Sequence, residues 1–324
     1  MTKISDPAPG LRLITLPLPF ELEHVNVGLV ELGDGYMLID TGMTFGPLSA
    51  ALENTGVRWP EIRIVVATHI HPDHISSAPL IIEASGASLM MHRAEFDYLN
   101  RVLEGNTHWI EQAFTQGGVP RSAWDAIRTA VGAMRNSLSA IHPDRFVEDG
   151  ELIPTALGPA VVVATPGHSP GHICLYWPDR RLLYSGDHMI QAITPNIAWM
   201  PGRDMLGEYL HSLEIVGGLD VELIVASHGE PFGNPREWIA ATRQHHDERC
   251  TAILNHLDSG SQTAYELVPV LWDRDFSSFH LYFALFEVLA HLEYMHRRRC
   301  IGFEMSDGGV RRWFNATSRS GRSA

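Results

Sequence analysis

THIHPDH, residues 68–74, is the segment from which the organisation of this 324-residue chain can be worked out. It contains four residues of the kinds that bind metals, His69, His71, Asp73 and His74. The run before it, IRIVVAT at 62–68, is apolar and β-branched, which predicts a strand buried on both faces. Side chains two residues apart in an extended turn point the same way, so His69, His71 and Asp73 can face one centre. Pro72 suits the first turn of a helix, which would direct His74 toward a second centre.

Three further segments repeat this arrangement of a strand that ends in a candidate ligand. ATPGH at 164–168 follows a Val-rich run, SGDH at 185–188 follows LLY, and ASHGE at 226–230 follows LIV. Ligands in open α/β sheets gather at the carboxyl ends of strands, so all four segments are expected at one edge. Each segment alone would more often be a buried histidine or a turn aspartate. Together they favour a metal site, and imidazole with carboxylate suits zinc, iron or manganese.

The motif set HIHPDH, TPGHSPGH, SGDH and SHGEP resembles that of the metallo-β-lactamase superfamily over residues 11–235. The resemblance implies an α/β fold, an αββα sandwich with a two-metal site along one edge. Carried over by motif, the ligands are His69, His71 and His168 for the first metal and Asp73, His74 and His228 for the second. Asp187 would bridge the two metals. Asp40, in the family's D-T-G turn, would orient a ligand through a hydrogen bond.

A two-metal site of this kind implies a hydrolase. Two metal ions a few Å apart lower the pKa of a shared water from 15.7 toward roughly 7, so metal-bound hydroxide exists at neutral pH. The candidate catalytic carboxylates are Asp187, as the bridge, and Asp73, as a ligand that could also accept a proton. His172 stands beside the ligands, either to support one of them or the substrate, or as packing. We expect two divalent metal ions, zinc first, with iron or manganese as alternatives.

Asp187 narrows the branch of the superfamily. The true β-lactamases mostly carry Cys or Ser at this position, whereas glyoxalase II, lactonases and phosphodiesterases carry Asp. Glyoxalase II ends in helices with cationic residues for glutathione, and this chain departs from that pattern, so a glutathione thioester is not expected. The C-terminal part of this chain is similar to that of the branch holding β-lactamase-like protein 2 and certain polyketide-carrier thioesterases. That branch includes thioester hydrolases and an endoribonuclease, so the resemblance alone does not select the reaction.

Residues 236–314 are predicted to form a second domain after the first, residues 1–235. Helical periodicity from Ile239 to Leu257, a short helix in TAYELVPVLW and a long helix in LYFALFEVLAHLEYMHRRR precede a strand, a Gly turn and a strand. Three helices and a two-stranded wing predict a winged-helix domain. The apolar face of the third helix suits either an intramolecular core or a homodimer interface. Residues 315–324 are expected to be a flexible tail.

Residues 93–146 are predicted to be a helical insertion in the first domain. Helical patterns in this region are broken by Gly and Pro residues. The insertion is either a packing elaboration or a lid over the substrate, and as a lid it would bring Trp109 to the pocket. Ile193 and Asn196 follow the strand end that carries Asp187, so we expect them to border the same pocket.

Charge favours a small substrate over a nucleic acid. Lys and Arg total 24 against 38 Asp and Glu, a net charge of −14, which repels phosphates. The alternative, a phosphodiesterase or ribonuclease, would use the winged-helix domain and the arginines at 297–299 and 311–312, yet binders of nucleic acid usually show a basic face. A catalytically silent regulator is a third class, disfavoured because all seven ligand positions are filled. We therefore expect a dinuclear hydrolase of a small acyl ester, thioester or lactone.

Cysteine usage and hydropathy bear on the compartment. Cys174, Cys250 and Cys300 form no C-x-x-C pair, which suits a reducing environment. No apolar run approaches the ~20 residues of a membrane span, and the chain does not begin like a signal peptide. We expect a cytoplasmic protein with no membrane partner.

Overall fold

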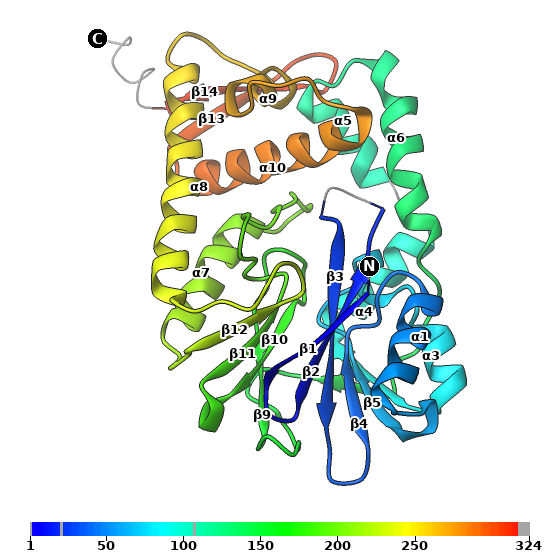
Figure 1. Cartoon of the computed structure of the whole chain (residues 1–324). Helices are drawn as coiled ribbons and strands as arrows, with labels where there is room; N and C mark the ends of the chain where they lie inside the picture. Colours follow the sequence, from blue (N-terminus) through cyan, green and yellow to red (C-terminus); the bar gives the residue numbers. More distant parts are fainter. Residues whose placement is uncertain (1, 20–21, 106–107, 317–324) are drawn as a thin grey trace. The chain divides into compact units, whose positions relative to one another are not determined.

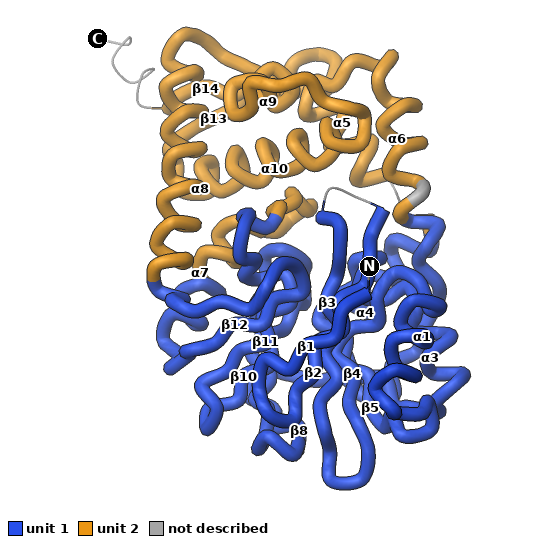
Figure 2. Tube along the Cα trace, in the orientation of Figure 1, with its two compact units in different colours: residues 1–104, 135–195, 212–236 blue, residues 105–134, 196–211, 237–324 orange. Residues whose placement is uncertain are grey.

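The structure, a computed structural model, describes residues 2–19, 22–105 and 108–316 (Figure 1). The chain divides into two compact units (Figure 2). Unit 1 comprises residues 1–104, 135–195 and 212–236, and unit 2 comprises residues 105–134, 196–211 and 237–324. Three helices, α6 (Arg121–Asn136), α7 (Met205–Gly217) and α8 (Pro235–Leu257), contribute residues to both units.

Unit 1 contains a seven-stranded sheet whose strands follow their order in the sequence. These strands are β1 (Lys3–Ala8), β2 (Leu11–Pro17), β3 (His24–Glu31), β4 (Tyr36–Ile39), β5 (Ile62–Val66), β6 (Ser88–His92) and β7 (Arg145–Val147). β1 to β4 pair antiparallel, and β4 to β7 pair parallel. β5 is the strand predicted ahead of residues 68–74, and Ile62, Val65 and Val66 are buried there as expected.

A five-stranded sheet faces the first one. Its strands are β8 (Leu152–Ile153), β9 (Ala160–Ala164), β10 (Ile173–Trp177), β11 (Leu182–Gly186) and β12 (Leu223–Ala226). Leu13 and Val66 of the first sheet share one apolar cluster with Leu175, Tyr184 and Val225 of the second. The hydrophobic core between the sheets therefore joins them into a two-layered sandwich.

Helices cover the other face of the seven-stranded sheet (Figure 1). They are α1 (Phe45–Thr55), α3 (Ala78–Ser85) and α4 (Arg93–Leu103), and the one-turn helix α2 (Pro72–Ile75) precedes α3. Successive side chains of a strand point to opposite faces, so Leu13 packs between the sheets while Ile14 packs on the helical side. Both faces are covered, which explains why these strands read as continuous apolar runs. The predicted mixed α/β fold is confirmed.

Unit 2 is mainly helical. Its elements are α5 (His108–Gly117), most of α6 (Arg121–Asn136), α8 (Pro235–Leu257), α9 (Ala264–Leu271), α10 (Ser278–Arg297) and the antiparallel pair β13 (Ile301–Met305) and β14 (Arg311–Asn315). The apolar face predicted for the third helix is buried within the chain, at Leu285, Val288, Leu289, Leu292 and Met295. Three helices and a two-stranded sheet occur in the predicted order; their winged-helix classification and a homodimer stay predictions. Of the predicted tail, residues 317–324 lie outside the described part.

The predicted insertion at 93–146 is divided between the units. α4 belongs to unit 1, residues 105–134 belong to unit 2, and the chain returns to unit 1 from residue 135. Its role as a lid, like the boundaries proposed for the two domains, stays a prediction. Among the described residues, no helix combines the length and the apolar character needed to span a bilayer.

Candidate metal centre

The four candidate ligand segments meet at one edge of the sandwich in unit 1. β9, β10 and β11 pair antiparallel in turn and β11 pairs parallel with β12, so β9, β11 and β12 run in the same direction. Their carboxyl ends lead directly to the segments that carry His168, Asp187 and His228. The Ile173 N–H donates to the Thr68 carbonyl oxygen at 3.1 Å, which ties this edge to the end of β5. The topology thus brings distant parts of the chain to one place.

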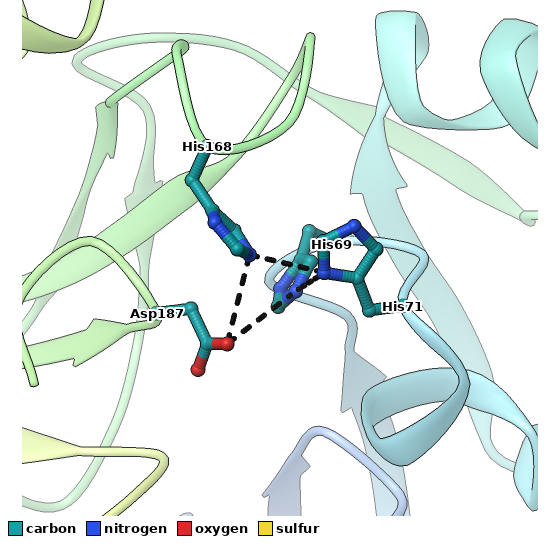
Figure 3. Close-up of side chains that lie close together, drawn as sticks. All are labelled: His69, His71, His168 and Asp187. Atoms are coloured by element: carbon teal, nitrogen blue, oxygen red, sulfur yellow. Dashed lines mark hydrogen bonds and ion pairs between the residues drawn. The ribbon is translucent and has the colours of Figure 1, made fainter. Parts of the chain in front are cut away.

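The first ligand group consists of His69, His71, His168 and Asp187 (Figure 3). His71 Nδ1 lies 3.0 Å from both His69 Nε2 and His168 Nε2. Asp187 Oδ2 lies 3.6 Å from His168 Nε2 and 4.0 Å from His69 Nε2. Four ligand atoms therefore converge on a small common volume.

The second ligand group consists of Asp73, His74 and His228. Asp73 Oδ2 lies 3.6 Å from His74 Nε2 and 3.3 Å from His228 Nε2. The other carboxylate oxygen of Asp187, Oδ1, lies 3.5 Å from His74 Nε2 and 3.4 Å from His228 Nε2. Asp187 thus faces the first group with one oxygen and the second group with the other.

Both groups fit divalent metal ions. A tetrahedral shell with ligand atoms about 2.0–2.1 Å from zinc places neighbouring ligand atoms about 3.3 Å apart, close to the separations found here. Among the described residues, His74 Nε2, His228 Nε2 and Asp187 Oδ1 are buried without a hydrogen-bond partner. Buried polar atoms in native proteins are normally satisfied, and a bound cation would satisfy these three atoms together. Neutral imidazole and carboxylate are the donor types that zinc, iron and manganese accept.

Hydrogen bonds on the far side of the imidazoles leave the converging nitrogens free to bind. His74 Nδ1–H donates to Asp40 Oδ2 at 2.8 Å, and His228 Nδ1–H donates to the His24 carbonyl at 2.7 Å. The Thr68 hydroxyl donates to Asp40 and accepts from His69 Nδ1–H at 3.0 Å. In its neutral form an imidazole that donates from Nδ1 carries its lone pair on Nε2, so each of these rings would bind a metal ion at the centre through Nε2.

The two groups differ in charge when no metal is bound. Burial lowers the pKa of His71 to about 3 and that of His69 well below its ordinary value, so both rings are neutral. Burial also acts on His228, but Asp187 and Asp73 outweigh it and raise its pKa to about 10. Burial alone would raise the pKa of Asp73, yet His74 and His228 lower it to about 2. The first group is thus ready for a cation, while the second holds protons that a cation must displace.

Comparison with known families identifies the chain. The family model described as "Metallo-beta-lactamase superfamily" matches residues 21–228, which include every ligand named above. The chain belongs to the metallo-β-lactamase superfamily. A second model, "Metallo-beta-lactamase-like, C-terminal domain", matches residues 250–316. The protein is therefore a superfamily hydrolase, and members of this superfamily typically bind divalent metals.

Curated relatives and solved structures agree with this membership. The chain is 28% identical over 228 residues to human acyl-coenzyme A thioesterase MBLAC2, an alignment that covers 66% of this chain and 76% of the relative. It is 25% identical to the lactamase-like protein nscB of Arthroderma otae, over 94% of this chain and 84% of that protein. The crystal structure of a β-lactamase domain protein from Burkholderia ambifaria superposes with a TM-score of 0.87 at 26% identity, over 97% of this chain and 94% of that one. A family protein from Thermus thermophilus gives a TM-score of 0.83 at 27% identity, over 95% and 99%.

Two predicted supporting residues lie against the candidate ligands of this superfamily member. Asp40 is fully buried with φ at 63°, and its carboxylate contacts both Thr68 and His74. His172 Nε2 accepts the Asp187 backbone N–H at 3.1 Å, and its Nδ1 lies 2.8 Å from Thr165 Oγ1. A Cβ at Gly186 would lie 2.6 Å from His172 Nε2, so only glycine lets the backbone at residue 186 approach the His172 ring this closely. His172 therefore positions the backbone of Asp187.

Sequence reasoning missed Glu95 of α4. Its carboxylate is fully buried and accepts hydrogen bonds from Ile70 N–H, Gly171 N–H and the Ser169 hydroxyl. One signal could have found it: Glu95 and Leu99 are four residues apart, so an acidic residue shares the buried face of the helix. A carboxylate on such a face needs hydrogen-bond partners, and those partners belong to the ligand loops.

The predicted pocket residues occupy different surroundings. Ile193 belongs to unit 1 and is 48% exposed. Trp109 and Asn196 belong to unit 2: the Trp109 ring meets Phe286 edge-on at 5.5 Å, and Asn196 Nδ2 donates to Glu287 Oε2 at 2.8 Å. These contacts explain how both side chains pack inside unit 2. A role for the three residues in substrate binding stays a prediction.

Proposed function

We propose that the protein is a dinuclear metal-dependent hydrolase of small acyl thioesters. The observation that carries the proposal is the position of Asp187, whose two carboxylate oxygens face different ligand groups. A bridging carboxylate of this kind suits two metal ions that share one substrate. Zinc is the metal we propose, with iron or manganese as alternatives to be decided by metal analysis.

Each group in the centre has a definite task. Bound metal ions would supply Lewis acidity and a nucleophile from water at neutral pH. His69, His71 and His168 would hold one ion, and Asp73, His74 and His228 the other, with Asp187 shared between them. Asp40 and the His24 carbonyl each accept the Nδ1–H of one ring, so His74 and His228 would bind a metal ion through Nε2 once the cation has displaced the proton there. The chain's contribution is thus to fix position and protonation before the substrate arrives.

Asp73 acts mainly as a ligand. Its side chain is 15% exposed, against 8% for Asp187, so it is the more accessible carboxylate of the two. His74 and His228 keep its pKa at about 2 despite its burial, and a carboxylate with so low a pKa is a weak base. Proton acceptance by Asp73 is therefore secondary to its role in holding a metal.

The relatives favour a thioester among the acyl substrates. One relative is an acyl-coenzyme A thioesterase, and the similarity covers two thirds of this chain. Hydrolysis would form a bond between the water oxygen and the acyl carbon and break the C–S bond, and the sulfur would leave as a thiol. The net charge of −14 disfavours a polyanionic carrier, so an uncharged thioester is an important comparison with acyl-coenzyme A.

Three of the five arginines named for the nuclease alternative are engaged in contacts within unit 2. Arg298 Nη1 lies 2.8 Å from Asp204 Oδ2, Arg297 Nε lies 2.8 Å from Glu293 Oε1, and Arg311 stacks over the Phe303 ring. These contacts favour packing over phosphate binding. We propose that residues 236–314, as a winged-helix-like domain, serve the fold and do not bind nucleic acid.

The test is the release of thiol from a panel of acyl thioesters. The panel contains acyl-coenzyme A esters of several chain lengths, matched acyl-N-acetylcysteamine esters, a lactone and a phosphodiester. We expect metal-replete protein to release thiol, metal-stripped protein to be inactive until metal is restored, and Asp187→Ala to lose more than the ~100-fold that an outer hydrogen-bond partner costs. Asp34→Asn, a change in the β3–β4 turn, is the matched control and should retain full activity.

Two results would overturn the proposal. Full activity of Asp187→Ala with two metals bound would exclude the bridging role. Failure of metal-replete protein to cleave any thioester, with cleavage of the phosphodiester, would replace the thioesterase assignment with the nuclease alternative.

A further inference from the structure

Glu95 links the two loops that supply the first ligand group. Its Oε2 accepts the Ile70 N–H at 2.9 Å, and its Oε1 accepts the Ser169 hydroxyl at 2.7 Å and the Gly171 N–H at 2.6 Å. Ile70 stands between the ligands His69 and His71, and Ser169 directly follows the ligand His168. One side chain therefore contacts both loops within one or two residues of three proposed ligands.

We propose that Glu95 is a positioning residue that sets the separation of these loops and thereby the affinity of the first metal group. The inference rests on the proposed function, because it assumes that His69, His71 and His168 hold a metal. It adds a residue outside the ligand motifs, on a helix within the predicted insertion at 93–146.

The surroundings of Glu95 make this contact rigid. Glu95 lies in the first turn of α4, where the partial positive charge of a helix N-terminus favours an ionised carboxylate. The start of that helix is capped by His92 Nδ1, which accepts the Ala94 N–H at 3.2 Å. A Cβ at Gly171 would lie 2.6 Å from His92 Nδ1, so the 165–172 loop sits directly against the beginning of α4. Hydrogen bonds to an ionised carboxylate are among the stronger ones in proteins.

The second ligand group is held by other means. His74 is oriented by Asp40, and His228 is oriented by the carbonyl oxygen of His24. His74 follows Ile70 in the same segment, but neither its ring nor that of His228 is among the groups that bond to Glu95 in the contacts described above. Loss of Glu95 should therefore weaken one metal group and spare the other.

The test compares metal affinities of Glu95→Gln and wild type, measured by competition with a chromophoric chelator. The glutamine has the same shape as the glutamate, but its NH₂ group is a donor. It would face a backbone N–H or a hydroxyl from which the carboxylate accepts a hydrogen bond, so that bond would be lost. We expect one of two bound zinc ions to bind about 10- to 100-fold more weakly and the other to bind unchanged. Asp97→Asn, an exposed change on the same helix, is the matched control and should leave both affinities unaltered.

Double variants identify which metal is affected. Glu95→Gln combined with His168→Ala should lose no more metal affinity than His168→Ala alone, because both act on the first group. Combined with His228→Ala, it should still weaken the metal that remains in the first group, because His228→Ala removes no ligand of that group. The visible spectrum of cobalt-substituted protein provides a second readout of the first group's geometry.

Several outcomes would overturn the inference. Glu95→Gln that binds both zinc ions as wild type does would exclude positioning, even if activity fell. An equal loss at both groups with a lower melting temperature would show a general structural role. If Glu95→Gln does not fold, Ser169→Ala, which removes one of the three bonds, must weaken the first metal alone by a smaller factor, and unchanged affinity would overturn the inference. Wild type that binds fewer than two metals would instead defeat the dinuclear function itself.

Discussion

Histidines and carboxylates lie together in both units among the described residues, and the two units differ in what the carboxylate does. In unit 1, both oxygens of Asp187 face imidazole nitrogens. In unit 2, His245, His246 and Glu287 also lie close enough to share a cation. There, however, one oxygen of Glu287 is paired with the Arg249 guanidinium and the other accepts Asn196 Nδ2–H. The arginine already neutralises the charge that a metal would need.

The histidines of unit 2 are also bonded to each other. His291 Nδ1–H donates to the Glu287 carbonyl at 2.8 Å, which leaves His291 Nε2 to accept from His246 Nδ1–H at 3.1 Å. Burial lowers the pKa of His246 to about 2 and that of His291 to about 3, so both rings are neutral. Proximity of metal-binding residue types therefore does not distinguish a metal site from packing. The distinction lies in whether the carboxylate and the lone pairs are already committed.

The largest expected effect comes from replacing one histidine of unit 1 and comparing the result with the replacement of one histidine of unit 2. His228→Ala removes a proposed ligand, so it should lose one metal equivalent and more than the ~100-fold in kcat/KM that an outer partner would cost. His246→Ala should keep two metals and the wild-type kcat, because it only creates a cavity in unit 2 and removes the hydrogen bond to His291. Its cost should appear as about 1–3 kcal/mol in the free energy of unfolding. Metal analysis, kinetics and urea denaturation on the same preparations measure all of these.

His246 Nε2 provides a further test of this comparison. It is buried without a hydrogen-bond partner among the described residues, so it retains a lone pair. A third metal equivalent in wild type that disappears in His246→Ala would show that unit 2 holds a metal after all. The contrast drawn above would then be wrong.

A smaller effect is expected from Asp40, which supports ligands without touching the centre. Asp40→Asn keeps the shape, but its amide can no longer accept from both Thr68 and His74 as the carboxylate does. His74 would then lose the hydrogen bond that orients its ring. Thr68, which bonds to His69, would lose one of its own hydrogen bonds. We expect metal affinity to fall by about 10- to 100-fold, measured by chelator competition. Wild-type affinity in Asp40→Asn would show that the ligands are held without this carboxylate.

The contrast between the units also shows what the sequence could and could not predict. The convergence of the candidate ligands could be predicted because residue type and position after a β-branched strand are local signals, and topology places such strand ends together. Pro72 begins α2 as its fixed φ predicts, and His74 lies in the second group. The helix takes Asp73 into that group as well, so the expectation from alternation that Asp73 faces one centre with His69 and His71 is wrong. Sequence reasoning placed Asn196 beside the pocket because it follows a strand end. Its hydrogen bond to Glu287 depends on packing against α10, 91 residues away, which no local pattern encodes.

Glu95 is a residue whose contacts could likewise not be predicted from the local sequence. Acidic residues on helices are usually solvated, and nothing near Glu95 in the sequence shows that Ser169 and Gly171 will approach it. The helical character of 93–146 was predictable from periodicity. The division of that segment between two units depends on long-range contacts, which periodicity does not contain.

The smallest expected effect concerns the pH dependence of stability in unit 2. The pKa of His246 is about 2 in the folded protein and about 6.5 when the chain is unfolded, so the unfolded state binds the extra proton. Its stabilising effect is complete above pH 6.5 and is lost as pH falls below that value. Between pH 7.5 and pH 5.5 the wild type should lose about 1.4 kcal/mol more free energy of unfolding than His246→Gln, which has no group to protonate. Urea denaturation at the two pH values measures this difference, and equal losses in the two proteins would mean that His246 is solvated, not buried as a neutral ring against His291.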